Sequence, residues 1–577
     1  MRSRQNLLLA LLVVVWLPGA SSVASMRPVH APHAMVVSVH ELASRAGTET
    51  MQAGGNAVDA AVATGFALAV VFPQAGNLGG GGFMLIRMAD GVTRFVDYRE
   101  KAPAAATPNM YLDAQGNVIE NASLVGYKAI GVPGSVAGLA YTQKNYGKLP
   151  LPQVMAPAIK LARDGFALAW EDAEDLRDED LAKFPESRRI FQRNGDYYKP
   201  GEIFRQPDLA RTLERIAKNP EDFYHGAMAR ELAATVQKGG GLITADDLAK
   251  YEVKEREAIR GRYRDYDIIS APPPSSGGIA LVEILNILEG YELGKSGNRS
   301  AQTIHLTAEA FRRAFYDRAE FLGDPDFAKI PVAQLIDKKY AAGWRESIDP
   351  EHASISKDLN RPAVFNELER YAQAHPQNMS AVREPENTTH YSVVDSAGNA
   401  VAVTTTLNDS LGSRVTAEGL GFLLNDEMDD FASKQGVPNV YGLIQGPANA
   451  IGPGKRPLSA MTPTLVLKDG KLFLVLGAEG GPTIISTVAD VVMGVVDFGL
   501  DVQEAVNAPR FHHQWLPDEI RVEDGVSLDT IRLLKSKGHK MQVGHLWGDS
   551  ECIAIDPKTG ERLGASDGRN NGRAMGY

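Results

Sequence analysis

The spacing of apolar residues predicts helices in the first part of the chain. Residues 40–72 are rich in alanine and valine and are interrupted only by Gly54-Gly55-Asn56. We expect two helices there, with Asn56 capping the second one through its side-chain oxygen. A further helix is predicted over residues 303–321, because apolar side chains recur along one helical face. These side chains are Ile304, Ala308, Phe311 and Phe315.

Strand patterns appear in two places along the chain. Residues 83–98 predict two strands joined by a turn at residues 89–91. From residue 388 onward strand patterns dominate, and we expect strands over residues 390–395, 400–407, 464–468 and 472–476. Helices follow near residues 483–499 and 525–537. Because strands and helices are grouped in blocks, the pattern favours antiparallel sheets covered by helices.

A polar segment, residues 345–386, precedes the strand-rich part. It is low in β-branched residues and carries Pro362, Pro376 and Pro385. Such a composition is typical of an exposed and mobile connector. The abrupt change of pattern therefore falls at Asn387-Thr388.

The first residues form a separate unit. Arg2 and Arg4 precede an apolar run over residues 7–17, and Ser22-Val23-Ala24 follows as a small-x-small site. This arrangement predicts a secretory signal peptide, residues 1–24, that is cleaved after Ala24. An uncleaved membrane anchor is the alternative. No later apolar run reaches about 18 residues, so we expect a soluble mature protein.

Composition and charge exclude several classes of protein. The chain has 577 residues, and 44% of them are hydrophobic, which excludes a mainly disordered or fibrous protein. Its net charge of −11 argues against nucleic-acid binding. Cys552 is the only cysteine, so no internal disulfide can form. It lies in an alternating strand pattern, and we interpret it as a buried small hydrophobe, not as a nucleophile.

Two motifs suggest ligand binding at first sight. The glycine-rich run at residues 77–83 lacks the Gly-Lys-Ser/Thr ending of a phosphate loop and precedes a strand pattern. His512 and His513 are adjacent, and neighbouring strand residues point to opposite faces, so the two cannot easily bind one ion. We therefore predict no cofactor and no metal.

The stretch from Asn387 to Leu407 carries the strongest chemical signal. Two strand patterns flank the turn sequence Ser396-Ala397-Gly398-Asn399. A hairpin centred on this turn places Thr388 opposite Thr406 or its neighbour, within reach of a hydroxyl contact. Threonines are common in strands, however, and the pattern alone favours that plain structural interpretation.

The position of Thr388 in the chain favours a catalytic interpretation over the plain structural one. A threonine hydroxyl is a poor nucleophile unless a base lies beside it. A chain break between Asn387 and Thr388 would create such a base, because the freed α-amine has a pKa near about 7.7–8. One residue would then be both nucleophile and general base, which would allow acyl transfer.

The residues around Thr388 resemble the processing site of the γ-glutamyltransferase (glutathione hydrolase) family of N-terminal-nucleophile hydrolases. The resemblance covers nearly the whole exported chain. Its motifs include residues 54–61, 77–83, 131–134, 272–278, 424–431, 455–459, 480–481, 507–515 and 576–577. It implies an α+β fold, a four-layer αββα sandwich with two stacked, mainly antiparallel sheets. It also implies cleavage into a large chain, 25–387, and a small catalytic chain, 388–577, intertwined in one fold.

The family also implies roles for individual residues. Thr388 would be the nucleophile and would also cleave the bond after Asn387. The catalytic group would further include Thr406, which bonds the Thr388 hydroxyl, and the oxyanion hole of Gly480 and Gly481. The substrate would be bound by Arg99, Asn408, Glu427, Asp430, Ser459 and Tyr441. In this group Arg99 and Ser459 would hold the substrate α-carboxylate, Glu427 and Asp430 its α-ammonium, and Tyr441 would belong to a lid.

The implied substrates are glutathione and other γ-glutamyl compounds, with water, amino acids or dipeptides as acceptors. We expect an exported, periplasmic or secreted enzyme. Two residues depart from the family pattern: Ala460 stands where a second serine is usual, and Glu479 where a proline is usual. Two alternatives therefore stay open. They are a related acylase for glutaryl-cephalosporins or poly-γ-glutamate, and an unprocessed protein that binds γ-glutamyl peptides without turnover.

Overall fold

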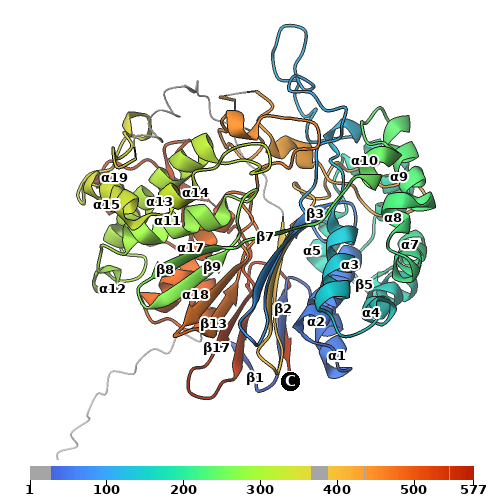
Figure 1. Cartoon of the computed structure of the whole chain (residues 1–577), viewed down its shortest axis with the longest axis horizontal. Coiled ribbons are helices and arrows are strands. Elements are labelled where there is room, and N and C mark those ends of the chain that lie inside the picture. The colour runs from blue at the N-terminus through green and yellow to red at the C-terminus, as the bar shows by residue number, and fades with distance from the viewer. Residues whose placement is uncertain (1–26, 366–387, 435, 438, 545) are drawn as a thin grey trace, which may run out of the picture.

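Two seven-stranded sheets form the centre of the computed structural model, which describes residues 27–365, 388–434, 436–437, 439–544 and 546–577 (Figure 1). The first sheet runs in the order β1 (Val29–Ala31), β18 (Arg562–Ala565), β17 (Cys552–Ile555), β13 (Lys471–Leu476), β12 (Thr464–Lys468), β9 (Tyr266–Ser270) and β8 (Ile259–Tyr263). The second runs β19 (Arg573–Gly576), β2 (Met35–Ser38), β10 (Thr389–Val394), β11 (Ala400–Thr406), β3 (Gly81–Arg87), β4 (Thr93–Asp97) and β7 (Lys254–Arg256). Neighbouring strands in both sheets are antiparallel, as predicted.

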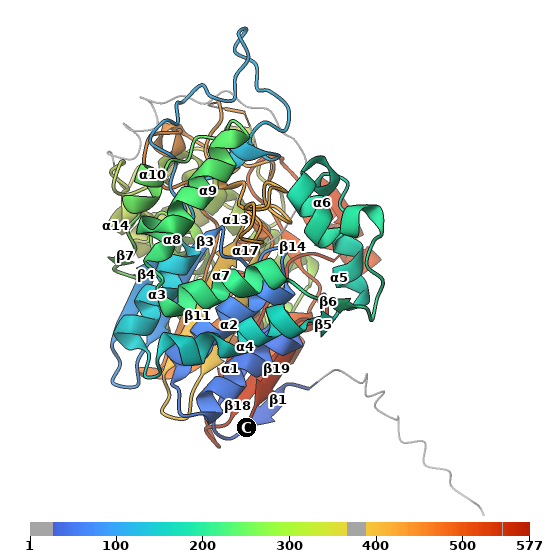
Figure 2. The same ribbon diagram turned by 90° about the vertical axis from the view of Figure 1, so that its right-hand side faces the viewer.

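Helices cover the outer face of each sheet (Figures 1 and 2). The second sheet is covered by α1 (Glu41–Gln52), α2 (Ala57–Val71) and α3 (Ser135–Tyr146), with α4 (Leu151–Asp164) and α7 (Pro207–Lys218) stacked outside them. The first sheet is covered by α11 (Gly277–Leu288) and α18 (Val502–Asn507), with α17 (Thr483–Val496) packed against both of them and α13 (Ala301–Phe321) packed on α11. The fold is thus the αββα sandwich predicted from the sequence.

The remaining elements lie outside these four layers. The short strands are β5 (Phe166–Ala167), β6 (Ile203–Phe204), β14 (Phe511–His512), β15 (Ile520–Glu523) and β16 (Met541–Gly544). The further helices are α5 (Trp170–Asp175), α6 (Pro185–Phe191), α8 (Asp222–His225), α9 (Ala227–Lys238), α10 (Ala245–Ala249), α12 (Leu293–Ser296), α14 (Val332–Leu335), α15 (Lys338–Glu346) and α19 (Leu528–Ser536). Among the described residues, no helix is both long and apolar enough to cross a bilayer.

The second sheet is buried on both faces because its strands alternate between two cores. In β3, Phe83 and Leu85 belong to the core shared with the first sheet, whereas Met84 and Ile86 pack under the helices of the other side. Side chains of a strand point to opposite faces in turn, so a fully apolar strand is buried on both. The register of β3 is set by its backbone pairs with β11 on one side and β4 on the other.

The predicted hairpin forms with the predicted register. In β10 and β11, Thr389 lies opposite Thr405, and Gly398 takes a positive φ of 87° in the turn. Asp395 holds this turn, because its carboxylate accepts hydrogen bonds from the backbone N–H groups of Ala397 and Asn399, both at 2.9 Å. The strand β10 lies between β2 and β11, so Thr388 is placed at the end of a central strand.

Most helix predictions are confirmed, with small shifts at the ends. Asn56 caps α2 as expected: its side-chain oxygen accepts from the N–H of Val58 and Asp59, each at 3.0 Å. The helix predicted over residues 525–537 begins only at Leu528, because Ser527 caps it through a bond from Asp529 N. In α13 burial extends beyond the predicted apolar stripe, since the whole helix is enclosed.

The polar connector is described only in part. Residues 347–365 are mostly exposed, as predicted, but several of their side chains bond to α13. Ser356 accepts from Arg312, and the Arg361 Nε donates to Asp317 Oδ1 at 2.6 Å. Residues 366–387, which include Asn387, and the predicted signal peptide lie outside the described residues.

Candidate active site

A small closed cavity gathers nearly all the predicted site residues. Its lining residues are Arg99, Arg318, Thr388, Thr406, Asn408, Glu427, Asp430, Tyr441, Leu443, Ser459, Ala460, Met461, Gly481, Pro482 and Ile484. The open space is about 20 Å³, which holds about one water molecule. Of the predicted residues, Gly480 lies next to the lining without belonging to it, and Asn387 lies outside the described residues.

The hydroxyl groups of Thr388 and Thr406 lie side by side at the end of the hairpin. Their Oγ1 atoms are 3.2 Å apart, and only 4% of Thr388 is exposed. Asn408 N donates to Thr406 Oγ1 at 2.9 Å, which fixes the orientation of this hydroxyl toward its neighbour. Asn408 itself adopts a φ of 84°, a left-handed conformation that asparagine tolerates better than most residues. The strand end thus holds a paired hydroxyl against the cavity.

The histidine nearest to Thr388 in the sequence does not serve as its base. Both ring nitrogens of His390 are engaged, with Thr404 Oγ1 at 2.8 Å and Ser392 Oγ at 3.2 Å. Burial lowers the pKa of His390 to about 3, so the ring stays neutral. The residues that line the cavity include carboxylates and arginines but neither histidine nor lysine. An amine created at Thr388 would therefore supply a nitrogen base, which the lining otherwise lacks.

Arg99 forms the charged side of the cavity. It directly follows β4 and is fully buried, and its guanidinium pairs with Glu427 and Asp430. Its Nε also donates to Pro457 O at 3.2 Å. Burial alone would lower the pKa of Arg99, but the two carboxylates outweigh it and raise the pKa above its usual range. In the structure, therefore, the residues expected to bind the two substrate charges bind one another.

The acidic turn opposite Arg99 is buried. A solvated turn is the ordinary interpretation of such a sequence, but Glu427 is only 1% exposed. Burial raises its pKa well above the usual range, against the charge of Arg99. Glu100 lies 3.5 Å from the same guanidinium, and burial raises its pKa to about 7. Three carboxyl groups thus surround one arginine, and burial acts against the charge of at least two of them.

Ser459 is held in place by the proline-rich loop at residues 272–278. Its backbone N–H donates to Pro274 O at 2.9 Å, and its carbonyl accepts from Ser276 N at 2.8 Å and from Ser276 Oγ at 2.6 Å. Its hydroxyl accepts from Met461 N at 3.0 Å and lines the cavity. Ala460 also lines the cavity, so the hydroxyl that the family pattern predicts at this position is absent.

The paired glycines lead from β13 into α17. Gly480 and Gly481 have φ values of 115° and 54°, which favour glycine. The carbonyl of Gly480 accepts from Thr483 N at 3.0 Å and from Thr483 Oγ1 at 2.7 Å. Because that carbonyl and the N–H of Gly481 belong to one trans peptide, they point in opposite directions. The N–H of Gly481 therefore points away from the first turn of α17.

Glu479, which precedes these glycines, does not line the cavity. Its carboxylate accepts a hydrogen bond from Asn570 Nδ2 at 3.3 Å, and its backbone N–H donates to Asp549 O at 2.8 Å. A carboxylate beside an oxyanion hole would oppose the developing negative charge. The contact with Asn570 directs this one elsewhere.

Tyr441 covers the cavity. Its hydroxyl donates to Asn408 O at 2.8 Å, and its carbonyl accepts from Gln514 Nε2 at 3.1 Å. A Cβ atom on Gly481 would lie 2.8 Å from the tyrosine ring, so only glycine allows this close packing. The open space of about 20 Å³ beside it holds about one water molecule, which is less room than a γ-glutamyl group needs.

Comparisons with known proteins agree with this geometry. The family described as "Gamma-glutamyltranspeptidase" matches residues 43–577. The chain belongs to this family. The glutathione hydrolase proenzyme of Escherichia coli is 50% identical over 547 residues, which cover 94% of this chain and 91% of that protein.

Two solved structures extend the comparison. The cephalosporin acylase from Bacillus halodurans aligns with a TM-score of 0.81 and 28% identity, over 98% of this chain and 99% of the other. The γ-glutamyltranspeptidase of Helicobacter pylori aligns with a TM-score of 0.55 and 46% identity, over 56% of this chain and 93% of that one. The αββα fold of this γ-glutamyltranspeptidase family member is thus shared with both.

Sequence reasoning missed two residues at this site, Glu100 and Arg318. Arg318 lines the cavity from α13, and it continues the apolar stripe of that helix three residues beyond Phe315. A charged residue on an apolar helical stripe is the signal that would have found it. Glu100 gave no comparable signal, because it looks like any charged residue after a strand.

One group of three side chains among the described residues could hold a metal ion: His305, Glu309 and His539, whose ligand atoms lie within 4.8 Å of one another. Sequence spacing did not reveal this group. Glu309, however, pairs with Arg312 and Arg313. Burial raises its pKa, but the arginines outweigh burial and lower the pKa to about 2. Their charges would repel a cation, and none of the three residues lines the cavity.

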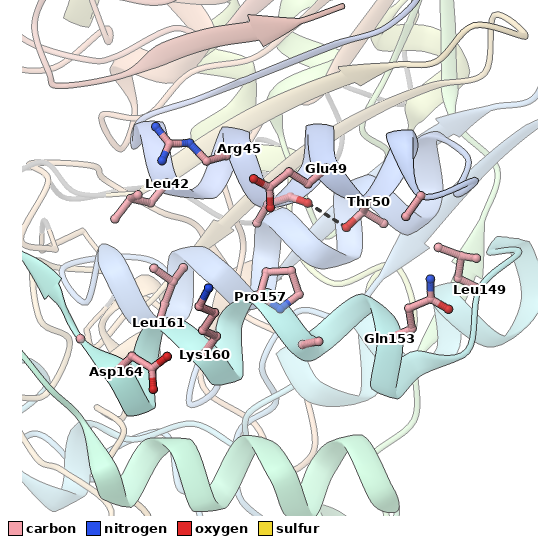
Figure 3. Close-up of a pocket in the computed structure, with 14 residues that line it drawn as sticks. Leu42, Arg45, Glu49, Thr50, Leu149, Gln153, Pro157, Lys160, Leu161 and Asp164 are labelled. Atoms are coloured by element: carbon pink, nitrogen blue, oxygen red, sulfur yellow. Dashed lines mark hydrogen bonds between the residues drawn. The ribbon is translucent and has the colours of Figure 1, made fainter.

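A larger groove lies between α1 and α4, far less suited to acyl transfer (Figure 3). Its volume is about 460 Å³, and its walls carry charges of both signs, including Arg45, Glu49, Lys160 and Asp164. The hydroxyl of Thr50 donates to Ala46 O at 2.7 Å, as Figure 3 shows. This groove contains no nucleophile with a base or an oxyanion hole beside it.

Proposed function

We propose that this chain is a self-processing γ-glutamyltransferase that cleaves γ-glutamyl amides such as glutathione. One observation carries the proposal. The hydroxyl of Thr388 lies 3.2 Å from that of Thr406, in one cavity with the charged group of Arg99, Glu427 and Asp430. This combination suits a substrate that carries an amide beside both an ammonium and a carboxylate.

The first step is cleavage of the chain itself. The Thr388 hydroxyl attacks the carbonyl of Asn387, and the resulting ester is opened by water. The products are a large chain, residues 25–387, and a small chain, residues 388–577, which stay together in one fold. The coverage of the Helicobacter pylori structure supports this division, since 93% of that solved chain matches only 56% of this one. A signal peptide over residues 1–24 would direct the protein to the periplasm or outside the cell.

The second step uses the new terminus of Thr388. Its α-amine takes the proton of the neighbouring hydroxyl as the oxygen attacks the γ-carbonyl of the substrate. The amide nitrogen leaves with a proton, and a γ-glutamyl ester remains on the threonine. Water, an amino acid or a dipeptide then takes the acyl group. Thr406 orients the hydroxyl, and the N–H groups of Gly480 and Gly481 stabilise the oxyanion.

Substrate binding exchanges one set of ion pairs for another. The α-ammonium of the γ-glutamyl group pairs with Asp430 and Glu427, with Asn408 beside them. The α-carboxylate binds to Arg99 and Ser459. Each charge thus keeps a partner when the cavity closes, which avoids the cost of burying an unpaired ion. Tyr441 returns over the cavity and excludes bulk water from the ester.

An acylase for glutaryl-cephalosporins is the second candidate, and the likeness to the Bacillus halodurans cephalosporin acylase favours it. A glutaryl group has no α-ammonium, however, and would leave Asp430 without a new partner. The charged side of the cavity therefore supports a γ-glutamyl donor over a glutaryl donor. An acylase for poly-γ-glutamate and a binder without turnover are the further alternatives.

The test is the behaviour of the mature chain on a denaturing gel and toward γ-glutamyl-p-nitroanilide. We expect two fragments and release of nitroaniline from the wild type, and neither from Thr388→Ala. Thr389→Val is the matched control, because it removes a neighbouring hydroxyl that has no hydrogen-bond partner among the described residues. It should still be cut. A single band that persists at the size of the uncut mature chain, slightly below the 62.2 kDa of the full chain, would overturn the proposal. Cleavage of glutaryl-p-nitroanilide alone would favour the acylase.

A further inference from the structure

Arg318 is a buried cation in the cavity wall that the mechanism above does not use. It is 2% exposed and lies on α13, and its Nε donates to Ser276 Oγ at 2.9 Å. Its Nη1 is buried and has no hydrogen-bond partner among the described residues. A buried guanidinium normally has all its donors satisfied and its charge paired. In Arg318 one donor lacks an acceptor, and no carboxylate of the described residues pairs with the charge.

Arg99 provides the contrast within the same cavity. Its guanidinium already contacts Glu427 and Asp430, with Glu100 at 3.5 Å. Arg318 forms no ion pair with any carboxylate of the described chain. Burial accordingly lowers the pKa of Arg318 to about 10, with only the charge of Asp430 acting against it. The residue still carries its charge at neutral pH, so an anion that entered the cavity would find this arginine uncompensated.

The surroundings of Arg318 indicate where such an anion would bind. Ser276, which accepts from Arg318, also donates to the carbonyl of Ser459 at 2.6 Å. Arg318 therefore lies beside the loop that carries Ser459 and Ala460. At Ala460 a hydroxyl that would face a carboxylate is missing. An arginine can supply two parallel N–H donors to a carboxylate, which a serine cannot.

We propose that Arg318 is a specificity-determining residue that binds the α-carboxylate of the γ-glutamyl donor through its unpartnered guanidinium nitrogen. This inference rests on the proposed function. Binding of the carboxylate gives Arg318 the counter-ion that it lacks, and it adds a second guanidinium to the contact that Arg99 and Ser459 make with the same group. The same pairing disfavours donors that lack a carboxylate at this position.

The test compares two donors that differ only in this group. γ-Glutamyl-p-nitroanilide carries the α-carboxylate, and 4-aminobutyryl-p-nitroanilide keeps the amine but lacks the carboxylate. In Arg318→Met we expect kcat/KM for the first donor to fall about 30-fold, mainly through KM, as removal of a buried ionic contact does. We expect the second donor to change less than about threefold. Arg318→Lys, which keeps the charge, should lie between the wild type and Arg318→Met.

A role limited to bracing the Ser459 loop predicts a different result. Ser276→Ala removes the hydroxyl that links Arg318 to this loop while leaving the cation in place. It should slow both donors alike, and a parallel loss of both donors in Arg318→Met as well would overturn the proposal. Each variant is first checked for two fragments on a gel, so that unfolded protein is recognised. A processed wild type that cleaves neither donor would refute the proposed function instead.

A binding measurement serves if turnover of the second donor is too slow. L-Glutamate should raise the melting temperature of the wild type more than 4-aminobutyrate does, because a ligand that binds the native state stabilises it. In Arg318→Met and Arg318→Lys this difference should shrink or vanish. An unchanged difference in both variants would show that Arg318 does not bind the carboxylate.

Discussion

The two sides of the cavity are built on opposite principles. The reaction side consists of Thr388, Thr406 and the glycines before α17, and it carries no charged side chain. The recognition side holds Arg99 and Arg318 together with Glu427 and Asp430, all but the last almost fully buried. In the proposed mechanism, the first side gains its base, the α-amine of Thr388, only when the chain is cut. The second side already holds its charged groups, and the substrate would have to replace the ion pairs between them.

This difference also follows the division of the chain. The hydroxyl pair comes from one hairpin, whose register fixes it locally. The charged side joins distant segments, because Arg99 and Arg318 precede the proposed cut and the acidic turn follows it. Self-cleavage therefore needs the hairpin, whereas substrate recognition needs both parts of the fold. Changes on the two sides should consequently separate processing from binding.

Among changes that leave Thr388 in place, the largest effect is expected from Asp430→Asn. This change removes the negative charge that the substrate α-ammonium would meet, so kcat/KM for γ-glutamyl-p-nitroanilide should fall about 1000-fold, or about 4 kcal/mol. The loss should appear in KM, while the chain should still cut itself. Steady-state kinetics and a denaturing gel measure the two effects. If self-cleavage failed as well, the separation of the two sides would be wrong.

A second test concerns the neighbouring carboxylate, Asp429, which does not line the cavity. It accepts from Ser123 Oγ at 2.6 Å and from Val440 N at 3.1 Å. Burial raises its pKa from near 4 to about 6, so the folded state keeps this proton to higher pH than the unfolded state. The contribution of Asp429 to the free energy of unfolding should therefore fall as the pH rises from about 4 to about 6, and it should stay constant at higher pH.

Asp429→Asn should remove this contribution. We expect the difference in unfolding free energy between pH 4.5 and pH 7.5 to shrink by about 2 kcal/mol, as measured by urea unfolding. The variant also serves as the matched control for Asp430→Asn, because it neutralises an acid of the same turn without touching Arg99. A KM effect as large as that of Asp430→Asn would show that the whole turn, and not one carboxylate, recognises the substrate.

The sequence predicted the reaction side better than the recognition side for a physical reason. The pairing of Thr388 with Thr406 follows from turn position and strand period, which are local properties. Whether an acidic turn is solvated or buried depends on what packs against it, and burial of Glu427 and Asp429 could not be inferred from spacing. The resemblance to the family supplied Arg99 and Asp430, but not that they bind each other in the empty cavity.

Glu479, which departs from the family pattern, and the unpartnered Arg318 show the same limit. At position 479 the sequence left open whether the carboxylate faces the oxyanion hole, because the answer depends on Asn570, which is distant in the chain. The unpartnered guanidinium of Arg318 could likewise be recognised only once the helix, the proline-rich loop and the Ser459 segment were placed together. Charge pairing is a property of the packed structure, whereas strand register can already be deduced from the chain.

The smallest effect is expected on the reaction side, from Thr406→Val. Valine keeps the shape of the side chain but removes the hydroxyl 3.2 Å from Thr388 and the acceptor for Asn408 N. A neutral hydrogen bond of this kind contributes about 1 kcal/mol, so self-cleavage and kcat should both slow about five- to tenfold with little change in KM. Thr406→Ser, which retains the hydroxyl, should stay close to the wild type. A change confined to KM would place Thr406 on the recognition side and would remove the contrast between the two sides of the cavity.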